Sequence, residues 1–321
     1  MDTLSEPTLL VALIELLVGV ALLAWAADEF VEGAARLAAA ARISPVVVGA
    51  VIIGFGTSAP ELLVSGVAAA GGNLDLGLGN IVGSNVANLS LVLGAAAFIV
   101  PLVVSRPVLT REAPLSLLAV LLFAYTTSGG LTRLDGVILL VALVVALGWV
   151  VVGGIGAHET LHEEGPFAIG AQARRTLIGL AGTVVGAQLL VWGAIAVAER
   201  LGVTGGFVGF TLVAVGTSLP ELVTAVVAAR KRETDLIIGN LLGSNMFNSL
   251  AVGGLIAVLG PGPVDDEGLR TVGITVMVLV AVAAWFAMVT LRRVYRVEAV
   301  VLVAAWFAAV IALARTASTT A

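Results

Sequence analysis

Residues 54–94 read GFGTSAPELLVSGVAAAGGNLDLGLGNIVGSNVANLSLVLG, and residues 214–254 read AVGTSLPELVTAVVAARKRETDLIIGNLLGSNMFNSLAVGG. The two stretches align without a gap at an offset of 160 residues, and 19 of their 41 positions are identical. This identity exceeds what the shared composition would give. The chain therefore carries an internal repeat, and its fold must hold two copies of one unit.

The composition predicts that most of the chain lies in lipid. Of 321 residues, 60% are hydrophobic and 12% are charged, whereas a soluble domain is about half apolar and about a quarter charged. A helix that spans a bilayer needs about 20 mainly apolar residues. We expect an all-α membrane protein with ten spans, at 8–39, 44–71, 76–101, 108–127, 134–154, 171–200, 204–230, 235–259, 268–291 and 296–315.

The distribution of basic residues predicts the orientation of these spans. Twelve of the sixteen Lys and Arg residues fall in loops that share one side, which the positive-inside rule makes cytoplasmic. Both termini should then be extracytoplasmic in a multi-pass protein of the cell membrane. The start of the chain lacks the basic segment of a signal peptide, so we expect the first apolar stretch to be a retained helix. No nucleic-acid partner is expected.

The repeat predicts two inverted halves. An offset of five spans, an odd number, turns the second copy upside down in the membrane, and inverted repeats that meet at a midplane site are a transporter architecture. We therefore divide the chain into a first five-helix repeat (1–155), a cytoplasmic connecting loop (156–170) and a second, inverted five-helix repeat (171–321). A site between two halves of one chain does not require an oligomer.

Each copy places a glutamate within an apolar span, Glu61 in the first and Glu221 in the second. A carboxylate at bilayer depth costs at least ~2.5 kcal/mol and indicates a functional site by default. Both follow a proline in the motif Gly-Thr-Ser-x-Pro-Glu, and proline clashes with the carbonyl four residues earlier. The sequence thus predicts a broken helix that frees the carbonyls of Gly56 and Gly216, which only a partner other than lipid can satisfy.

Hydroxyl and amide side chains accompany the glutamates. The motif hydroxyls precede each glutamate by three and four residues and should share a helix face with it. The next helix of each copy carries Gly-Ser-Asn-x-x-Asn, with Ser and the second Asn again four residues apart. The predicted cation site is Thr57, Ser58, Glu61, Ser84 and Asn88 from the first copy and Thr217, Ser218, Glu221, Ser244 and Asn248 from the second.

These residues form an all-oxygen set. Ca²⁺ and Na⁺ are hard cations, and Ca²⁺ takes six to eight oxygen ligands. Neither copy contains the His or Cys that softer metals favour. Single hydroxyls in membrane helices often serve only helix packing, and prolines often only kink a helix, but packing does not account for two repeated glutamates. Glycines at 79, 83, 239 and 243 should let helices approach closely here.

The paired GTSxPE and GSNxxN motifs on ten spans resemble the sodium/calcium exchanger branch of the cation/Ca²⁺ exchanger superfamily, in its compact prokaryotic form. The resemblance implies that the ten residues above line the site. It adds the backbone carbonyls three residues before each motif threonine, Gly54 and Ala214. It also implies that the first and sixth helices slide against an eight-helix core. The expected activity is Na⁺/Ca²⁺ antiport by alternating access, with no cofactor and no enzymatic reaction.

One position departs from part of the family. Potassium-dependent exchangers typically carry Asp where Asn248 stands, so Asn248 argues against K⁺ transport. A H⁺/Ca²⁺ exchanger is a further alternative, but that branch shows Gly-Asn-x-x-Glu motifs that are absent here. From other classes, a channel commonly forms by oligomeric symmetry, and an intramembrane hydrolase needs a nucleophile–base pair or a metal site that the sequence lacks.

Two further patterns have ordinary interpretations. His158-Glu159-Thr160-Leu161-His162 matches H-E-x-x-H, the signature of a zinc protease. It lies in the connecting loop without a third ligand, so a solvated acidic loop is the expected structure, with weak regulatory cation binding as the alternative. The acidic residues of the first span, Glu15 and residues 28, 29 and 32, are expected on solvated faces, or else to attract cations toward the site.

Overall fold

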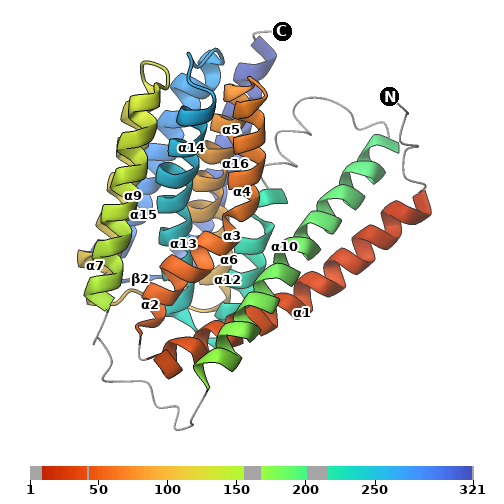
Figure 1. The fold of residues 1–321 in the computed structure, drawn as a ribbon, viewed down its shortest axis with the longest axis vertical. Helices are drawn as coiled ribbons and strands as arrows, with labels where there is room; N and C mark the ends of the chain where they lie inside the picture. Colours follow the sequence, from red (N-terminus) through yellow and green to blue (C-terminus); the bar gives the residue numbers. More distant parts are fainter. Residues whose placement is uncertain (1–8, 42, 155–167, 201–215, 320–321) are drawn as a thin grey trace.

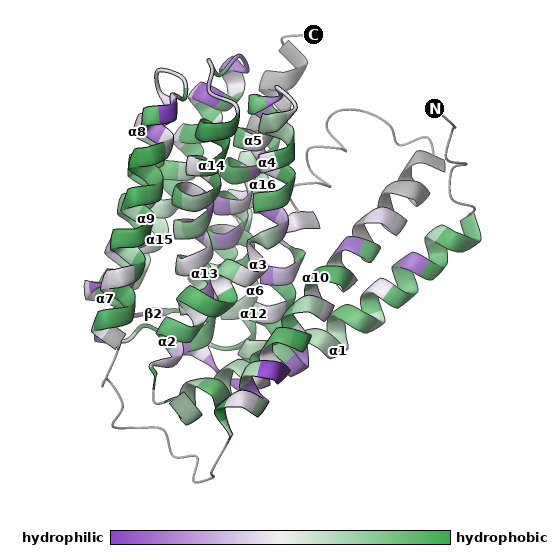
Figure 2. Ribbon diagram, viewed as in Figure 1, coloured by the Kyte–Doolittle hydropathy of each residue, from purple (hydrophilic) through white to green (hydrophobic). Residues whose placement is uncertain are grey.

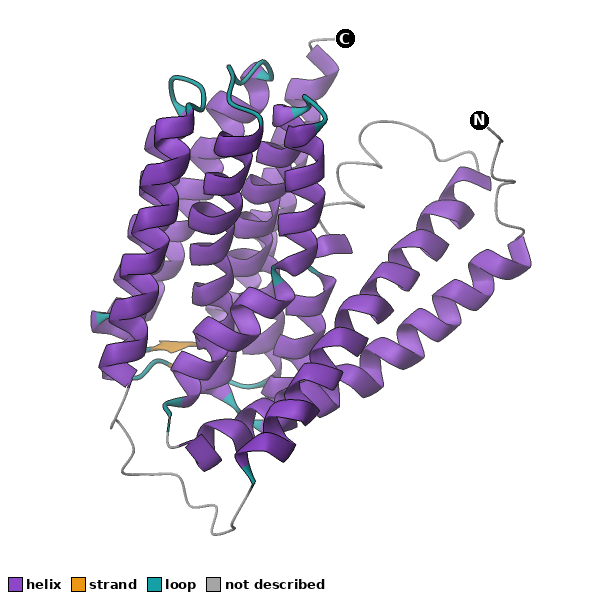
Figure 3. Cartoon of the chain, viewed as in Figure 1, coloured by secondary structure: helices purple, strands orange, loops and turns teal. Residues whose placement is uncertain are grey.

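The computed structural model describes residues 9–41, 43–154, 168–200 and 216–319 (Figure 1). Figure 3 shows that helices make up nearly all of this part of the chain. The elements in chain order are α1 (Leu9–Ala41), α2 (Pro45–Val47), η1 (Val48–Ile53), α3 (Gly54–Thr57), α4 (Ala59–Ala70), α5 (Leu74–Ala87), η2 (Asn88–Val92), α6 (Leu93–Ile99), β1 (Leu102–Val103), α7 (Arg106–Thr110), α8 (Glu112–Thr127), α9 (Arg133–Gly154), α10 (Ile169–Arg200), α12 (Leu219–Lys231), α13 (Thr234–Phe247), η3 (Asn248–Val252), α14 (Gly253–Leu259), η4 (Leu269–Gly273), α15 (Ile274–Leu291), β2 (Arg293–Val294) and α16 (Arg296–Thr319), where η denotes a π-helix.

Several of these helices are suited to cross a membrane. Six helical stretches in the described residues are long and apolar enough, and a seventh is the bent pair formed by Pro45–Thr57 and Ala59–Ala70. Figure 2 shows hydrophobic residues along most helices and hydrophilic ones at the loops and within the bundle. Large apolar side chains are exposed along α1, α9 and α15, as expected where lipid covers them. The chain is therefore a multi-span membrane protein.

Contacts between loops place them at two ends of the bundle. β1 pairs antiparallel with β2, joining the loop after α6 to the loop after α15. At the opposite end, Leu131 and Gly262 form an isolated bridge between two other loops. There the Asp75 carboxylate also accepts hydrogen bonds from the backbone N–H groups of Asp265 and Asp266, both at 3.1 Å. Each contact joins loops that the charge count assigned to a common side, and the identity of the cytoplasmic side stays a prediction.

α1 and α10 pack against each other along much of their length (Figure 1). Glycines bring the backbones together: a Cβ on Gly179 would lie 2.4 Å from the Phe30 nitrogen, and one on Gly193 would lie 2.7 Å from the Ala12 oxygen. Later positions of α10 meet earlier positions of α1, so the two helices run antiparallel. They form a closely fitted pair that extends away from the other helices.

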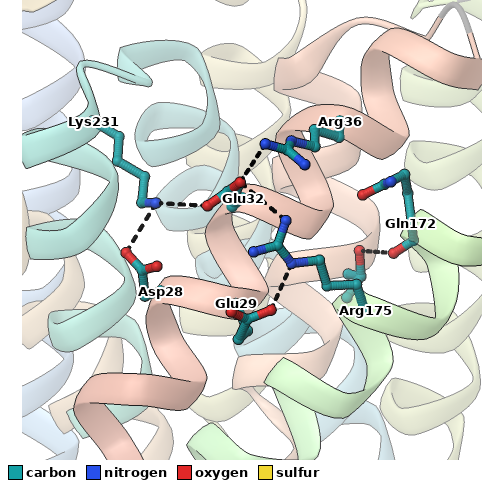
Figure 4. A network of polar contacts seen from close by, with 8 residues as sticks. Asp28, Glu29, Glu32, Arg36, Gln172, Arg175 and Lys231 are labelled. Atoms are coloured by element: carbon teal, nitrogen blue, oxygen red, sulfur yellow. Dashed lines mark hydrogen bonds and ion pairs between the residues drawn. The ribbon is translucent and has the colours of Figure 1, made fainter. Parts of the chain in front are cut away.

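A network of ion pairs joins this pair to the rest of the bundle (Figure 4). Its charged members are Asp28, Glu29, Glu32 and Arg36 of α1, Arg175 of α10 and Lys231 of α12. Arg175 bonds Glu29 at 2.6 Å and Glu32 at 3.0 Å, and Lys231 bonds Asp28 at 2.9 Å and Glu32 at 3.2 Å. Three acidic and three basic side chains balance one another. The acidic face predicted as solvated, or as attracting cations, is therefore engaged in ion pairs.

The helices that carry the repeated motifs form the interior. α13 is buried along nearly its whole length, and α5 along most of it. Two glycines of α13 touch the backbone of α2 and η1: a Cβ on Gly239 would lie 2.3 Å from the Val46 oxygen, and one on Gly243 would lie 2.2 Å from the Ala50 oxygen. The predicted close approach at glycines is confirmed for these two. The equivalent partners of Gly79 and Gly83, residues 206 and 210, lie outside the described residues.

Candidate cation site

A break in the helix precedes each repeated glutamate. Ser58 separates α3 from α4 with φ −83° and ψ 4°, and Ser218 precedes α12 with nearly the same values, φ −86° and ψ 5°. Proline stands at the second position of each following helix, as its missing N–H predicts. The Ser58 N–H donates to the carbonyl of Gly54 at 3.1 Å, and the freeing of the Gly56 carbonyl by Pro60 stays a prediction.

Glu61 and Glu221 are completely buried. One oxygen of Glu61 accepts hydrogen bonds from Ser84 at 3.2 Å and from Ser218 at 3.4 Å. One oxygen of Glu221 accepts from Ser244 at 3.4 Å. The other oxygen of each carboxyl group has no hydrogen-bond partner among the described residues. Because an unpartnered buried polar group is costly, two such oxygens in one interior indicate a ligand that the protein alone does not supply.

The motif threonines bond residues of the opposite repeat. The Thr57 hydroxyl lies 3.2 Å from the Asn240 oxygen, 3.3 Å from the Ser244 hydroxyl and 3.1 Å from the carbonyl oxygen of Ile53. The Thr217 hydroxyl donates to the Asn80 oxygen at 3.1 Å. The sequence predicted that each threonine shares a helix face with the glutamate of its own motif. The hydrogen bonds show in addition that each threonine side chain contacts an asparagine of the other repeat.

Ser244 lies at the centre of a cluster of oxygen atoms. Its hydroxyl oxygen is 3.4 Å from the carbonyl of Gly54, from Glu221 and from Asn240, and 3.3 Å from Thr57. A hydroxyl has only one hydrogen to donate, so it satisfies one of these oxygens at a time. The Gly54 carbonyl thus belongs to this cluster of oxygen atoms, and its role as a cation ligand stays a prediction. Its counterpart, Ala214, lies outside the described residues.

Asn88 and Asn248 occupy equivalent places in the two repeats. Each begins a π-helix, η2 or η3, and is completely buried. The amide nitrogen and oxygen of both have no partner in the part of the chain that the structure describes, and the same holds for the Ser58 hydroxyl. π-Helical turns are rare and occur frequently at functional sites. No motif in the sequence predicts these π-helical turns.

Eleven of the twelve predicted site residues are among the described residues, and the ten that contribute side chains are at most 8% exposed. Hydrogen bonds connect eight of the eleven to one another or to Asn80 and Asn240, while Ser58, Asn88 and Asn248 are buried without side-chain partners there. Asn80 and Asn240 were not predicted. The sequence could have indicated them, because an asparagine occurs at this position in both copies of the repeat, one helical turn before the site serine.

The arrangement offers oxygen ligands only. It combines two carboxylates, hydroxyls, two free amides and a backbone carbonyl, the set that Na⁺ and Ca²⁺ prefer. No cluster of three or more His, Cys, Asp or Glu side chains occurs within the described ranges. The H-E-x-x-H segment at 158–162 lies outside them. The site therefore combines two buried carboxyl groups with neutral oxygen donors.

Comparison with known proteins agrees with this chemistry. The profile of the family described as "Sodium/calcium exchanger protein" matches residues 11–152 and 175–315. The antiporter CaxA of Alkalimonas amylolytica is 39% identical over 301 residues, which cover 90% of this chain and 94% of that protein. The sodium/calcium exchanger MaX1 of Methanosarcina acetivorans is 29% identical over 304 residues, covering 79% and 85%. A structure of the sodium-calcium exchanger NCX_Mj superposes with a TM-score of 0.86 at 30% identity, covering 95% of this chain and 99% of that one.

Proposed function

This chain belongs to the sodium/calcium exchanger protein family, and we propose on that premise that it exchanges Na⁺ for Ca²⁺ across the cell membrane by alternating access. The observation that carries the proposal is the pair of completely buried glutamates, Glu61 and Glu221, each with one oxygen left without a partner among the described residues. Ca²⁺ and Na⁺ are the substrates, and the family transports ions without chemical catalysis or a cofactor.

The cation ligands we propose are those predicted from the repeats and the family resemblance: Gly54, Thr57, Ser58, Glu61, Ser84, Asn88, Ala214, Thr217, Ser218, Glu221, Ser244 and Asn248. With both glutamates ionised, the site carries a charge of −2. One Ca²⁺ or two Na⁺ neutralise it, so the same oxygens can serve the two substrates alternately. A bound cation would provide a partner for the buried oxygens of Glu61 and Glu221 that have none among the described residues.

We propose ten spans in two inverted repeats, residues 1–155 and 171–321, joined by a cytoplasmic loop at 156–170. The equivalent helix breaks at Ser58 and Ser218 and the equivalent π-helices η2 and η3 support the repeat. Both termini face outward, and one chain contains a complete site. The whole-length similarity to NCX_Mj supports the same arrangement.

The α1–α10 pair is the part that we propose to move. Its helices fit each other through glycines, whereas its ionic ties to the motif-bearing helix α12 run through Lys231. A sliding pair must break the bonds from Lys231 to Asp28 and Glu32. Half-exposed ion pairs are worth only about 0–1 kcal/mol each, so water and salt allow such bonds to exchange during a cycle.

The decisive experiment measures ⁴⁵Ca²⁺ uptake into proteoliposomes that contain the purified protein, with Na⁺, K⁺ and H⁺ gradients imposed one at a time. We expect an outward Na⁺ gradient to drive uptake with choline in place of all K⁺. This expectation follows from Asn248. Its neutral amide adds no negative charge to the site that would bind K⁺ beside Na⁺ and Ca²⁺. Empty liposomes and liposomes without a gradient are the controls.

The other gradients distinguish the alternatives. Uptake driven by H⁺ and indifferent to Na⁺ would assign the chain to H⁺/Ca²⁺ exchange. Uptake that stops when K⁺ is removed and returns with K⁺ would show that the interpretation of Asn248 is wrong. Downhill Ca²⁺ flux without a counter-ion would indicate a channel and refute antiport.

The proposed orientation predicts the sidedness of two exposed positions. The parent chain has no cysteine, so single substitutions label cleanly. Ser128 lies in the loop between α8 and α9, and Arg293 lies in β2, at the opposite end. In intact cells, a membrane-impermeant maleimide should label Ser128→Cys and should label Arg293→Cys only after permeabilisation. The reverse pattern would overturn the orientation, and the cysteine-free parent is the control.

A further inference from the structure

Two buried asparagines outside the proposed ligand set lie directly behind the site. Asn80 and Asn240 are each 3% exposed, occupy equivalent positions on α5 and α13, and stand four residues before Ser84 and Ser244. A buried amide requires partners for both its oxygen and its nitrogen. The partners found here connect the two repeats.

Asn80 bridges a threonine of the second repeat to a serine of the first. Its oxygen accepts from the Thr217 hydroxyl at 3.1 Å, and its nitrogen donates to the Ser65 hydroxyl at 3.0 Å. Ser65 is completely buried one turn after Glu61, on the same helix α4. The Asn80 side chain is therefore held at both ends.

Asn240 makes the equivalent connection in the opposite direction. Its oxygen lies 3.2 Å from the Thr57 hydroxyl, whose single hydrogen is shared between this oxygen and the carbonyl of Ile53 at 3.1 Å. Its nitrogen lies 3.4 Å from the Thr224 hydroxyl. Thr224 already donates its single hydrogen to the carbonyl of Pro220 at 2.7 Å. Its hydroxyl can therefore only accept from Asn240, which fixes the amide nitrogen toward Thr224 and the amide oxygen toward Thr57.

The direction of these bonds matters for a cation ligand. A hydroxyl binds a cation through its lone pairs, so its hydrogen must point elsewhere. An amide oxygen behind the threonine takes that hydrogen and leaves the lone pairs for the site. Neighbours of metal ligands commonly orient the ligands in this way, and their loss typically costs 10–100-fold in metal affinity or activity.

We propose that Asn80 and Asn240 are positioning residues that orient the hydroxyls of Thr217 and Thr57 toward the transported cation, each across the boundary between the repeats. The inference rests on the proposed function, because it concerns the same site. It adds that each half of the chain orients the hydroxyl of one proposed cation ligand in the other half. Neither asparagine is itself a ligand in this arrangement.

The test is a double-mutant cycle on the pair with the shorter bonds. The KM for Ca²⁺ in Na⁺-driven uptake is measured for wild type, Asn80→Leu, Thr217→Val and the double variant. We expect Asn80→Leu to raise KM about 10-fold in the wild-type background. In the Thr217→Val background it should change KM by less than about twofold, since residues that act through one contact are not additive. Equal changes in both backgrounds would overturn the proposal.

Asn85→Leu is the matched control. Asn85 lies on the same helix and is 1% exposed, but its nitrogen bonds Ser249 at 2.9 Å and Met277 at 3.4 Å. A general packing effect would make Asn85→Leu couple to Thr217→Val as strongly as Asn80→Leu does, and that result would reduce Asn80 to a structural role. We expect Asn85→Leu to change KM by the same factor in both backgrounds.

A milder variant covers the case in which Asn80→Leu does not fold. Ser65→Ala removes only the partner that holds the Asn80 nitrogen, and we expect a severalfold rise in KM that disappears in the Thr217→Val background. An unchanged KM would contradict the proposal. Absence of Na⁺-driven uptake by wild type would refute the proposed function instead, so the two failures are separable.

Discussion

Glu61→Gln and Glu221→Gln are each expected to abolish Na⁺-driven Ca²⁺ uptake while the protein remains folded. Ca²⁺ gives up its hydration shell on entering the site, and fixed charge must replace it. Each substitution keeps the shape of the side chain but leaves one negative charge against a divalent ion. Removing one partner of a buried charge pair costs about 3–5 kcal/mol, which corresponds to ~100-fold or more in affinity.

The measurement is the initial rate of ⁴⁵Ca²⁺ uptake at several Ca²⁺ concentrations, with size-exclusion elution and thermal unfolding as checks of folding. Glu298→Gln is the matched control, because it makes the same change at the start of α16, where the carboxylate caps the N–H of Tyr295 at 3.0 Å. We expect uptake by this control to match wild type. Near-normal uptake by either site variant would refute the assignment of both glutamates as the charged ligands.

Gly243→Ala is expected to lower both transport and stability severely, although it adds a single methyl group. The new Cβ would lie 2.2 Å from the Ala50 oxygen and 2.5 Å from its Cα. These are backbone atoms, so α13 and η1 must separate, and overpacking of this kind typically costs about 1–3 kcal/mol or more. Ser244 follows directly, and the separation would move its hydroxyl away from Thr57 and Gly54. We expect uptake to fall at least ~10-fold and the unfolding temperature to drop by several degrees.

Gly148→Ala adds the same methyl group to α9, where nothing lies within 4 Å of the new Cβ. Transport and unfolding temperature should remain those of wild type, apart from the slight gain expected when alanine replaces glycine within a helix. Gly239→Ala, whose Cβ would lie 2.3 Å from the Val46 oxygen, should reproduce the Gly243 effect. If Gly243→Ala behaved like Gly148→Ala, the close approach of α13 to η1 would not be needed for function.

The sequence by itself determined the features that depend on residues close together in the chain. Apolar length indicated the membrane helices, the proline motifs indicated the helix breaks before Glu61 and Glu221, and the repeat indicated equivalent positions in two halves. These inferences hold because a proline breaks its own helix and a buried carboxylate requires compensation whatever the rest of the fold is. The family resemblance followed from the same local motifs.

Only the tertiary structure decided which side chains meet. Helical spacing says which residues share a face, but it does not say which helix that face touches. Thr57 therefore contacts Asn240, 183 residues away, in addition to the local carbonyl of Ile53. The acidic residues of α1 likewise have ion-pair partners on α10 and α12. Such contacts depend on how closely packed helices pass each other, which in this bundle is set by single glycines such as Gly243.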